Sequence, residues 1–381
     1  MVEIIETLKN LKISMITGVP DSLLVELIHS IELSDLKPYV HVAPNEGNAV
    51  ALAAGHYLGS GSPAIVYMQN SGLSNALNPL ISFAHKKMFG IPMILIIGWR
   101  GELNEQEIQL PDEPQHMIQG FITRKQLADL EIPYHIGSKD HQIFAEQLEA
   151  AYKESFNVQS PIAILVRKGV FDNRVTKPAG SGQITSLQAV QKIVELSPKN
   201  ALFVGSTGMI GRELLKSTEK HPEFDGRVIL NVGAMGHVSA LAKGIASANP
   251  SKVVICIDGD GSLLMHLGSL ALLPNLTNFK HILLNNNSHD SVGGQRTAFF
   301  KKNHRGIYRG FSKKGYCRIK HFNNYSTMLM SRKLSSSKSC FIELLCAPRQ
   351  EIIKDGKIMN DLPRPTKTPK QYEKSFRKWI E

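Results

Sequence analysis

The sequence predicts an α/β protein made of two doubly wound parallel-sheet domains. Short β-branched runs alternate along the chain with amphipathic stretches, which is typical of parallel sheets covered by helices on both faces. The alternation stops at a polar segment, 172–183 (DNRVTKPAGSGQ), and starts again after it. We therefore expect a first domain at 1–171, a linker at 172–183 and a second domain at 184–381.

The first expected domain begins the alternation. Its expected strands are short apolar or β-branched runs, and they lie at 14–17, 39–43, 64–69, 93–98 and 162–166. Its expected helices carry apolar residues at helical spacing, and they lie at 21–31, 47–58 and 74–86. A helix between successive strands is the connection that parallel strands need.

The second expected domain repeats this pattern. Its expected strands lie at 201–205, 228–232, 253–257 and 282–284. Its expected helices lie at 187–196, 210–216 and 238–248, and one more follows the third strand. The two domains are therefore expected to be of similar size and of the same class.

Composition indicates a globular protein. The chain has 381 residues and is 42% hydrophobic, which is enough for ordinary buried cores. No apolar stretch approaches bilayer length, and the start, MVEIIETLKN, lacks the pattern of a secretory signal. We therefore expect a cytoplasmic protein with no membrane partner. The four cysteines form no CxxC pair and stand in or beside apolar runs, which favours buried thiols.

The formal net charge of +11 comes from one segment. Residues 299–340 hold 11 Lys and Arg and no Asp or Glu, and the 33 basic residues elsewhere balance the 33 acidic ones. The segment has no RNA-binding signature and no zinc-finger spacing, so we expect no nucleic-acid partner. A solvated face, or a region that steers an anionic substrate, accounts for the excess.

An acidic and an amide side chain follow two neighbouring strands. GDGS (259–262) comes after the run 253–257, and NNN (285–287) follows the run 282–284. The carboxyl ends of parallel strands meet at one edge, beside helix N-termini that favour phosphate, so Asp260 and Asn286 should lie together there. Mg²⁺ prefers oxygen ligands of these kinds. The pair indicates a Mg²⁺ and diphosphate site, and the plain alternative is a tight turn and a polar loop.

These residues resemble the metal and diphosphate motif of thiamine diphosphate enzymes. The resemblance implies that Asp260, Asn286 and the carbonyl of Ser288 bind Mg²⁺. It implies cofactor contacts from the rest of the first motif, Gly259, Gly261 and Ser262. It also implies a pyrimidine domain followed by a diphosphate domain, with active sites at the subunit interface of a homo-oligomer.

A second motif belongs to the same resemblance. The family has a glutamate at the start of a helix that follows a short strand, and HVAPNEGNAVALAAGHYLGSG offers Glu46 in that setting. Its carboxyl would hydrogen-bond N1′ of the aminopyrimidine and favour the imino tautomer, which is acid–base catalysis relayed through a ring. Glu46 also suits a first-turn acid that the helix dipole favours, and the two roles are compatible.

Two glycine-rich segments resemble further cofactor contacts. In VGAMGHVSALAKGIA (232–246), Met235 would support the cofactor from below and the carbonyl of Gly233 would accept from its 4′-amino group. In GSTGMIGREL (205–214), Gly208 lies in a strand-to-helix turn suited to the diphosphate. Taken alone, Met235 is more typical of a core position, and a glycine-rich turn is not specific.

The closer resemblance is to the phosphonopyruvate decarboxylase family, and it covers nearly the whole chain. The segments that carry it are TGVPDSLL, PNEGNAVALAAGHYL, QNSGLSNALNPL, IGWRGE, DEPQHMIQG, HDSVGGQ and the tail RPTKTP. The implied reaction converts 3-phosphonopyruvate, a small anionic 2-oxo acid, to phosphonoacetaldehyde and CO2 through a thiamine diphosphate ylide and enamine. Its implied setting is phosphonate biosynthesis of the 2-aminoethylphosphonate type.

Four residues are candidates for contact with the substrate. Asp21 in GVPDS resembles an aspartate near the reacting carbon, and a turn or helix N-cap role accounts for it equally well. His116 in DEPQH is the candidate substitute for a histidine pair that larger relatives use in proton transfer. Arg100 in GWRG suits the phosphonate or carboxylate, with a plain surface arginine as the equal alternative. Gln295 in HDSVGGQ is the second substrate-binding candidate.

Other functions fit the same motifs less well. Sulfopyruvate decarboxylase uses the same cofactor on an isosteric anion, and GWRG and DEPQH favour the phosphonate. An acetohydroxyacid-type carboligase needs a central domain, for which this chain has no room. A cofactor-binding but inactive subunit is a further alternative, disfavoured because Glu46, Asp260 and Asn286 are all present.

Overall fold

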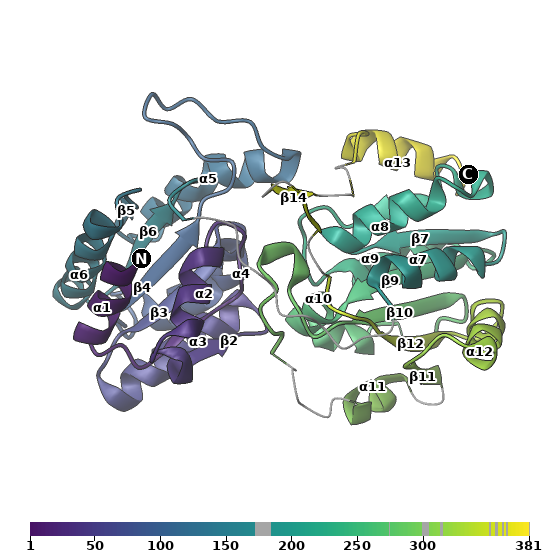
Figure 1. Cartoon of the computed structure of the whole chain (residues 1–381), viewed down its shortest axis with the longest axis horizontal. Coiled ribbons are helices and arrows are strands. Elements are labelled where there is room, and N and C mark those ends of the chain that lie inside the picture. The colour runs from purple at the N-terminus through teal and green to yellow at the C-terminus, as the bar shows by residue number, and fades with distance from the viewer. Residues whose placement is uncertain are drawn as a thin grey trace. The chain divides into compact units, whose positions relative to one another are not determined.

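The computed structural model of the chain describes residues 1–171, 184–273, 275–298, 305–312, 315–349, 352–354, 357–359, 362 and 365–380. It divides into two compact units, Met1–Thr176 and Lys177–Glu381, each with its own six-stranded sheet (Figure 1). The predicted linker, 172–183, lies outside the described residues, so its bounds stay a prediction.

The first unit contains a parallel sheet in the order β2-β1-β3-β4-β6-β5. Its strands are β1 (Ile16–Gly18), β2 (Val40–Val42), β3 (Ala64–Gln69), β4 (Met93–Gly98), β5 (Tyr134–Ile136) and β6 (Pro161–Val166). The sequence predicts β3 and β4 at these bounds and β6 one residue short, because continuous apolar runs suit strands buried on both faces. The edge strand β5 has no such run and was not predicted.

Helices cover both faces of this first sheet. One face carries α1 (Val2–Asn10), α2 (Val25–Leu33) and α6 (His141–Val158). The other carries α3 (Glu46–Ser60), α4 (Gly72–Pro79) and α5 (Pro114–Asp129). The helix expected at 74–86 is in fact two elements, because α4 ends at Pro79 and a π-helical turn, Leu80–Ala84, follows.

The second unit contains a parallel sheet in the order β11-β12-β10-β9-β7-β8. Its strands are β7 (Ala201–Gly205), β8 (Val228–Leu230), β9 (Val253–Gly259), β10 (Phe279–Asn285), β11 (Tyr316–Ile319) and β12 (Cys340–Leu345). A separate antiparallel pair is formed by β13 (Ile352–Lys354) and β14 (Lys357–Met359).

Helices also cover both faces of the second sheet. One face carries α7 (Ser186–Glu195), α8 (Met209–Thr218) and α12 (Asn324–Leu334). The other carries α9 (Val238–Ala248), α10 (Asp260–Met265), α11 (Arg305–Ser312) and α13 (Pro369–Arg377). Short 3-10 turns occur at Lys37–Tyr39, Pro222–Phe224, Leu267–Ala271 and Asp290–Val292.

The two sheets have the same strand order. Read from its other edge, the second order is β8-β7-β9-β10-β12-β11, so β1 to β6 correspond one by one to β7 to β12. In each unit the second strand lies on one side of the first strand, and the third strand lies on its other side. This reversal is the point at which open parallel sheets bind ligands, beyond the carboxyl ends of the strands. The predicted fold class is confirmed.

The cysteines and helix lengths bear on two expectations from composition. Cys256, Cys340 and Cys346 are buried and Cys317 is half-buried, all as free thiols, as the sequence predicts.

Among the described residues, no helix combines the length and the apolar character that crossing a membrane requires.

Gly120→Ala should destabilise the first unit. A methyl group on Gly120, within α5, would overlap the backbone carbonyl of Gly101, and the backbone would have to move. We expect a loss of roughly 1–3 kcal/mol in the free energy of unfolding, measured by urea denaturation. The matched control is Gly59→Ala in α3, where nothing lies within 4 Å of the added methyl group and a gain of roughly 0.5–1 kcal/mol is expected. Equal effects at the two positions would contradict the close packing at Gly120.

Candidate functional site

A pocket lies at the carboxyl ends of β7 and β9, the reversal point of the second sheet. It has a volume of about 90 Å³ and is lined by the turns after these strands and by the loop after β10. Seven residues predicted to bind the cofactor or metal line it together, namely Met235, Gly259, Asp260, Gly261, Ser262, Asn286 and Ser288. The topology thus gathers residues that are far apart in the sequence.

The other two predicted cofactor glycines border this pocket. Gly233 N–H donates to Thr207 Oγ1 over 3.3 Å, and Thr207 is a lining residue. Gly208 follows Thr207 and caps α8 with a φ of 78°, a conformation that favours glycine. Gly208 therefore lies in the turn after β7, and Gly233 contacts that turn from the segment after β8. Their predicted contacts with a cofactor stay predictions.

Asp260 begins α10 with its carboxyl buried. The pKa of Asp260 is raised to about 7, mainly by burial and also by the nearby carboxylate of Asp290, and the hydrogen bond from Thr297 Oγ1 (2.9 Å) opposes the rise. A divalent cation would favour the charged form and reverse these effects. The electrostatics of Asp260 therefore fit a metal ligand.

Asn286 is held so that its amide oxygen points along the loop after β10. Asn286 Oδ1 accepts from Ser288 N–H over 3.0 Å, and Asn286 Nδ2 donates to Asp290 Oδ2 over 2.7 Å. An amide oxygen has two lone pairs, so one remains for a cation. Asp290, which the sequence reasoning passed over, orients this amide and also accepts from Arg349 N–H over 2.8 Å.

Two hydroxyl groups connect the turns around the pocket. Ser206 Oγ donates to Ser262 Oγ over 3.2 Å, and Ser262 Oγ accepts from Gly236 N–H over 3.2 Å. The turn after β7, the start of α10 and the segment that carries Met235 are thereby tied to one another. Met235 itself is half-buried and faces the pocket rather than a hydrophobic core.

Gln295 is not among the residues that line this pocket. Its backbone carbonyl accepts from His289 N–H over 2.8 Å, and its side chain is buried. Gln295 Oε1 has no hydrogen-bond partner in the described part of the chain. The predicted contact with substrate therefore stays a prediction. His289 does line the pocket, and burial lowers its pKa to about 4, so its ring is neutral at physiological pH.

Glu343 supports the end of β10 from within the sheet. This fully buried β12 residue accepts from Asn285 Nδ2 over 2.7 Å, directly before Asn286. It also accepts from Arg318 Nε and Nη2, each over 2.7 Å. Arg318, one residue of the basic segment, is therefore part of an internal ion pair. The sequence signal that could have pointed to this buried carboxylate is a glutamate inside the apolar run CFIELL.

A cluster of three buried polar residues lies within β9 and β10, before the carboxyl ends of these strands. Cys256, Asp258 and His281 place one ligand-type atom each within 4.8 Å of one another. Asp258 accepts from His281 Nε2 over 3.3 Å and from Gly259 N–H over 2.9 Å. None of the three lines the pocket, and the contacts with Gly259 stabilise the strand end that leads to Asp260.

In the first unit, Glu46 begins α3 after β2 with a nearly buried side chain. Glu46 is 6% exposed, and burial raises the pKa of its carboxyl while the hydrogen bond from Asn75 Nδ2 (2.7 Å) opposes the rise. A methyl group on Gly72, at the start of α4, would overlap the Glu46 side chain. The helix-start position and a buried carboxyl therefore coexist, as both interpretations of Glu46 require.

Asp21 follows β1, at the reversal point of the first sheet. Its carboxylate accepts from Leu23 N–H over 3.0 Å and from Gln69 Nε2 over 2.7 Å. Since α2 begins at Val25 and is capped by Leu24, Asp21 is a turn residue rather than a helix N-cap. Burial raises the pKa of Asp21, and both hydrogen bonds and the charge of Arg100 lower it.

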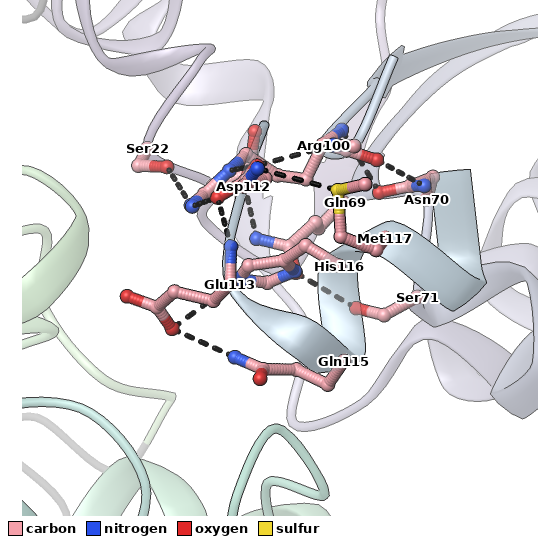
Figure 2. A network of polar contacts seen from close by, with 12 residues as sticks. Ser22, Gln69, Asn70, Ser71, Arg100, Asp112, Glu113, Gln115, His116 and Met117 are labelled. Carbon is pink, nitrogen blue, oxygen red and sulfur yellow. Dashed lines mark hydrogen bonds and ion pairs between the residues drawn. The ribbon is translucent and has the colours of Figure 1, made fainter. Parts of the chain in front are cut away.

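Arg100 and His116 lie on two segments that meet near Ser22 (Figure 2). Arg100, after β4, makes a two-point ion pair with Asp112, and its Nη1 donates to Ser22 Oγ over 3.4 Å. His116 lies in the first turn of α5, where its Nε2 is 3.9 Å from Glu113 Oε2. Arg100 is thus not a plain surface arginine, and Asp112 was absent from the sequence prediction.

Comparison with known proteins connects both units to cofactor-binding domains. Residues 3–127 match the family "Thiamine pyrophosphate enzyme, N-terminal TPP binding domain" and residues 204–322 match its C-terminal TPP binding domain. The chain is 34% identical over 319 residues to the phosphonopyruvate decarboxylase of Streptomyces viridochromogenes, covering 77% of this chain and 75% of that protein.

Two further relatives show the same breadth of coverage. The phosphonopyruvate decarboxylase of Streptomyces hygroscopicus is 32% identical over 76% of this chain and 73% of its own length. The sulfopyruvate decarboxylase of Methanosarcina acetivorans is 25% identical over 78% of each chain. The similarity therefore spans both units.

Glu46→Gln should stabilise the protein above acidic pH when no cofactor or divalent cation is added. Because burial raises the folded pKa of Glu46 above its unfolded value, ionisation opposes folding, and stability falls as the pH rises through the folded pKa. Urea denaturation at a series of pH values should show a gain for the variant at pH 8 that shrinks toward pH 4. The control is the exposed Glu149→Gln in α6, which should show no such trend. A variant that is less stable than the wild type at pH 8 would refute the buried-carboxyl assignment.

Proposed function

The chain belongs to the thiamine diphosphate-dependent decarboxylase family, and on that premise we propose that it decarboxylates 3-phosphonopyruvate. The products would be phosphonoacetaldehyde and CO2, in phosphonate biosynthesis of the 2-aminoethylphosphonate type. The observation that carries the proposal is the second-unit pocket, which gathers Asp260, Asn286, Ser288 and Met235. Two phosphonopyruvate decarboxylases more than 30% identical over three quarters of the chain favour this substrate.

The second-unit residues would bind the charged end of the cofactor. Asp260, the Asn286 amide oxygen and the Ser288 carbonyl would hold Mg²⁺, which in turn would hold the diphosphate. The positive-φ glycines Gly208 and Gly233 let backbone approach closely at the turns, and Met235 would support the cofactor from below. When bound, thiamine diphosphate supplies the nucleophilic carbon and the electron sink that loss of CO2 from a 2-oxo acid requires.

The first-unit residues would handle protons and substrate. Glu46, whose raised pKa favours a protonated carboxyl, would hold a proton against the aminopyrimidine. Asp21 and His116 are the candidate proton donors near the reacting carbon, and Arg100 would contact the acid group of the substrate. The family that the sequence resembles has its active sites at subunit interfaces, so we propose a homo-oligomer in which one subunit supplies Glu46 and another supplies Asp260.

Sulfopyruvate is the second candidate substrate. The sulfopyruvate decarboxylase relative covers as much of the chain, although at lower identity. Phosphonate and sulfonate have the same shape and differ by one charge near neutral pH. Side-by-side kinetics with the two substrates would decide between them, and a higher kcat/KM for sulfopyruvate would overturn the phosphonate assignment.

Purified protein supplied with thiamine diphosphate and Mg²⁺ should release CO2 from phosphonopyruvate, and Glu46→Gln should reduce kcat by roughly 100-fold or more, because acid–base catalysis contributes about 10²–10⁴-fold. The matched control is Glu32→Gln in α2, another glutamate whose pKa burial raises. It should leave kcat nearly unchanged. Turnover by Glu46→Gln at the wild-type rate would contradict the role, and no turnover by the wild type would point to the inactive-subunit alternative.

Asp260→Asn should raise the Mg²⁺ concentration that half-saturates cofactor binding. Loss of a charged ligand costs about 1.5–3 kcal/mol, which corresponds to roughly 10- to 100-fold in affinity. Calorimetric titration of thiamine diphosphate at several Mg²⁺ concentrations measures the change. The exposed Asp225→Asn serves as control. An unchanged Mg²⁺ requirement in Asp260→Asn would exclude Asp260 as the metal ligand.

A further inference from the structure

A second cavity lies within the first unit, beyond the carboxyl ends of β4 and β6. It has a volume of about 220 Å³, and its polar lining comes from Arg100, Glu102, Asp112 and Lys168 beside the ring of Trp99. Open parallel sheets bind ligands beyond the carboxyl ends of their strands, and this cavity lies at that edge, to one side of the reversal point between β1 and β3. The cavity is therefore placed to receive a small charged group.

The backbone of Arg100 is fixed on both sides. Asn70 Oδ1 accepts from Arg100 N–H over 3.1 Å, and Asn70 Nδ2 donates to the Arg100 carbonyl over 3.0 Å. Trp99 Nε1 donates to the Gly120 carbonyl over 3.0 Å, and Gly101, at φ 65°, packs so closely on α5 that a methyl group there would overlap the His116 carbonyl. Arg100 therefore projects from a rigid point.

Asp112 fixes the direction of the guanidinium group (Figure 2). Arg100 Nε donates to Asp112 Oδ2 over 2.8 Å, and Nη2 donates to Oδ1 over 2.6 Å. The same carboxylate accepts from the N–H groups of Gly101 (3.1 Å) and Glu113 (2.8 Å). Burial tends to raise the pKa of Asp112, but the hydrogen bonds from Arg100 and Glu113 hold it well below its usual range, so it stays ionised.

One edge of the Arg100 guanidinium group remains available. The group has five N–H bonds, and Asp112 takes one from Nε and one from Nη2. In the described part of the chain, the edge formed by Nη1 and Nη2 has only Ser22 Oγ as a partner, at 3.4 Å from Nη1. Two donors in one plane match two oxygens of a phosphonate, sulfonate or carboxylate group.

The charges around Arg100 are partly offset. Glu102 lines the same cavity, and its Oε2 lies 3.9 Å from Arg167 Nε. Asp21 is next to Ser22 in the chain, with its carboxylate bonded to Gln69 and Leu23. Lys168 adds a positive charge to the cavity lining. An anion bound to Arg100 would therefore meet a region that carries cations as well as carboxyl groups.

We propose that the free edge of Arg100 and the hydroxyl of Ser22 form a site for the phosphonate group of the substrate, with Asp112 as the positioning residue. The identity of the ligand rests on the proposed function. In phosphonopyruvate one methylene separates the phosphorus from the keto carbon, so the keto carbon of a substrate held here would lie two bonds from the phosphorus. The site would select for substrates that carry a charged group one methylene away from the keto carbon.

A tryptophan reporter tests the site without catalysis. The chain has two tryptophans, and Trp379→Phe leaves Trp99, which lines the cavity, as the single reporter. Titration with 3-phosphonopropionate, an unreactive analogue of the substrate, should change the Trp99 fluorescence in a saturable way. Asp112→Asn and Arg100→Lys should each weaken this binding by roughly 10- to 100-fold, the usual range for a charge-assisted hydrogen bond.

Steady-state kinetics separate positioning from simple loop anchoring. Asp112→Asn should raise KM for phosphonopyruvate by the same 10- to 100-fold and change kcat by less than about threefold. The matched control is Glu107→Gln, because the exposed Glu107 also holds the loop before α5, through a two-point ion pair with Arg124. It should leave KM unchanged. Equal rises in KM for the two variants would show that Asp112 only anchors the loop and would overturn the proposal.

The outcomes also separate this site from the proposed function. Suppose that the wild-type protein binds 3-phosphonopropionate in an Arg100-dependent way but releases no CO2 from phosphonopyruvate. This result would support the site and contradict the proposed function. Suppose instead that the wild type decarboxylates phosphonopyruvate, and that Asp112→Asn and Arg100→Lys bind the analogue as tightly as the wild type does. This result would support the proposed function and contradict the site.

Discussion

Burial of carboxyl groups at the carboxyl ends of the two sheets is the constraint on which the local structure depends. Glu46, Asp21 and Asp260 are each less than 10% exposed, and burial raises the pKa of all three. A buried charge costs several kcal/mol unless it is paired, so these positions are unfavourable for an isolated fold. The neighbouring backbone leaves room for them: a methyl group on Gly98 would overlap the Asp21 carboxylate, and one on Gly72 would overlap Glu46. Burial therefore favours the protonated form of each carboxyl group, and a bound cation would favour the ionised form.

Each unit also holds a two-point arginine–carboxylate pair. Arg100 and Asp112 lie after β4 in the first unit, and Arg318 and Glu343 lie on β11 and β12 in the second. Pairs of this kind add little net stability, because desolvation offsets the attraction, but they fix side chains in one direction. In the first unit the pair aims a guanidinium group, and in the second it holds Asn285. Arg318 also shows that the basic segment is not one uniform charged surface, although Lys301, Lys302, Lys313 and Lys314 lie outside the described residues.

The sequence predicted what depends on short-range pattern and missed what depends on folded loops. The bounds of β3 and β4 follow from their apolar runs, and the position of Asp260 and Asn286 at one edge follows from the parallel topology. The partner of Arg100 was not predictable, because the contact with Asp112 arises only when the loop before α5 folds back. For the same reason the position of Gln295, outside the pocket lining, could not be read from the motif HDSVGGQ. The edge strand β5 was missed because half-buried strands lack a continuous apolar run.

The identical strand order of the two sheets explains why the motifs occur in corresponding places. The third strand ends before Asn70 in the first unit and before Asp260 in the second, and the fourth ends before Trp99 and Arg100 in one and before Asn286 in the other. In each unit these side chains lie at the carboxyl edge of that unit's own sheet, near its reversal point. Their chemistry differs, however: the first edge offers buried carboxyl groups and a directed arginine, and the second offers hard oxygen ligands around a pocket. Among the described residues, the buried glutamate at a helix start lies at the first edge and the pocket lined by Asp260 lies at the second. Under the proposed function, a complete site needs one edge of each kind, which the proposed homo-oligomer would supply from two subunits.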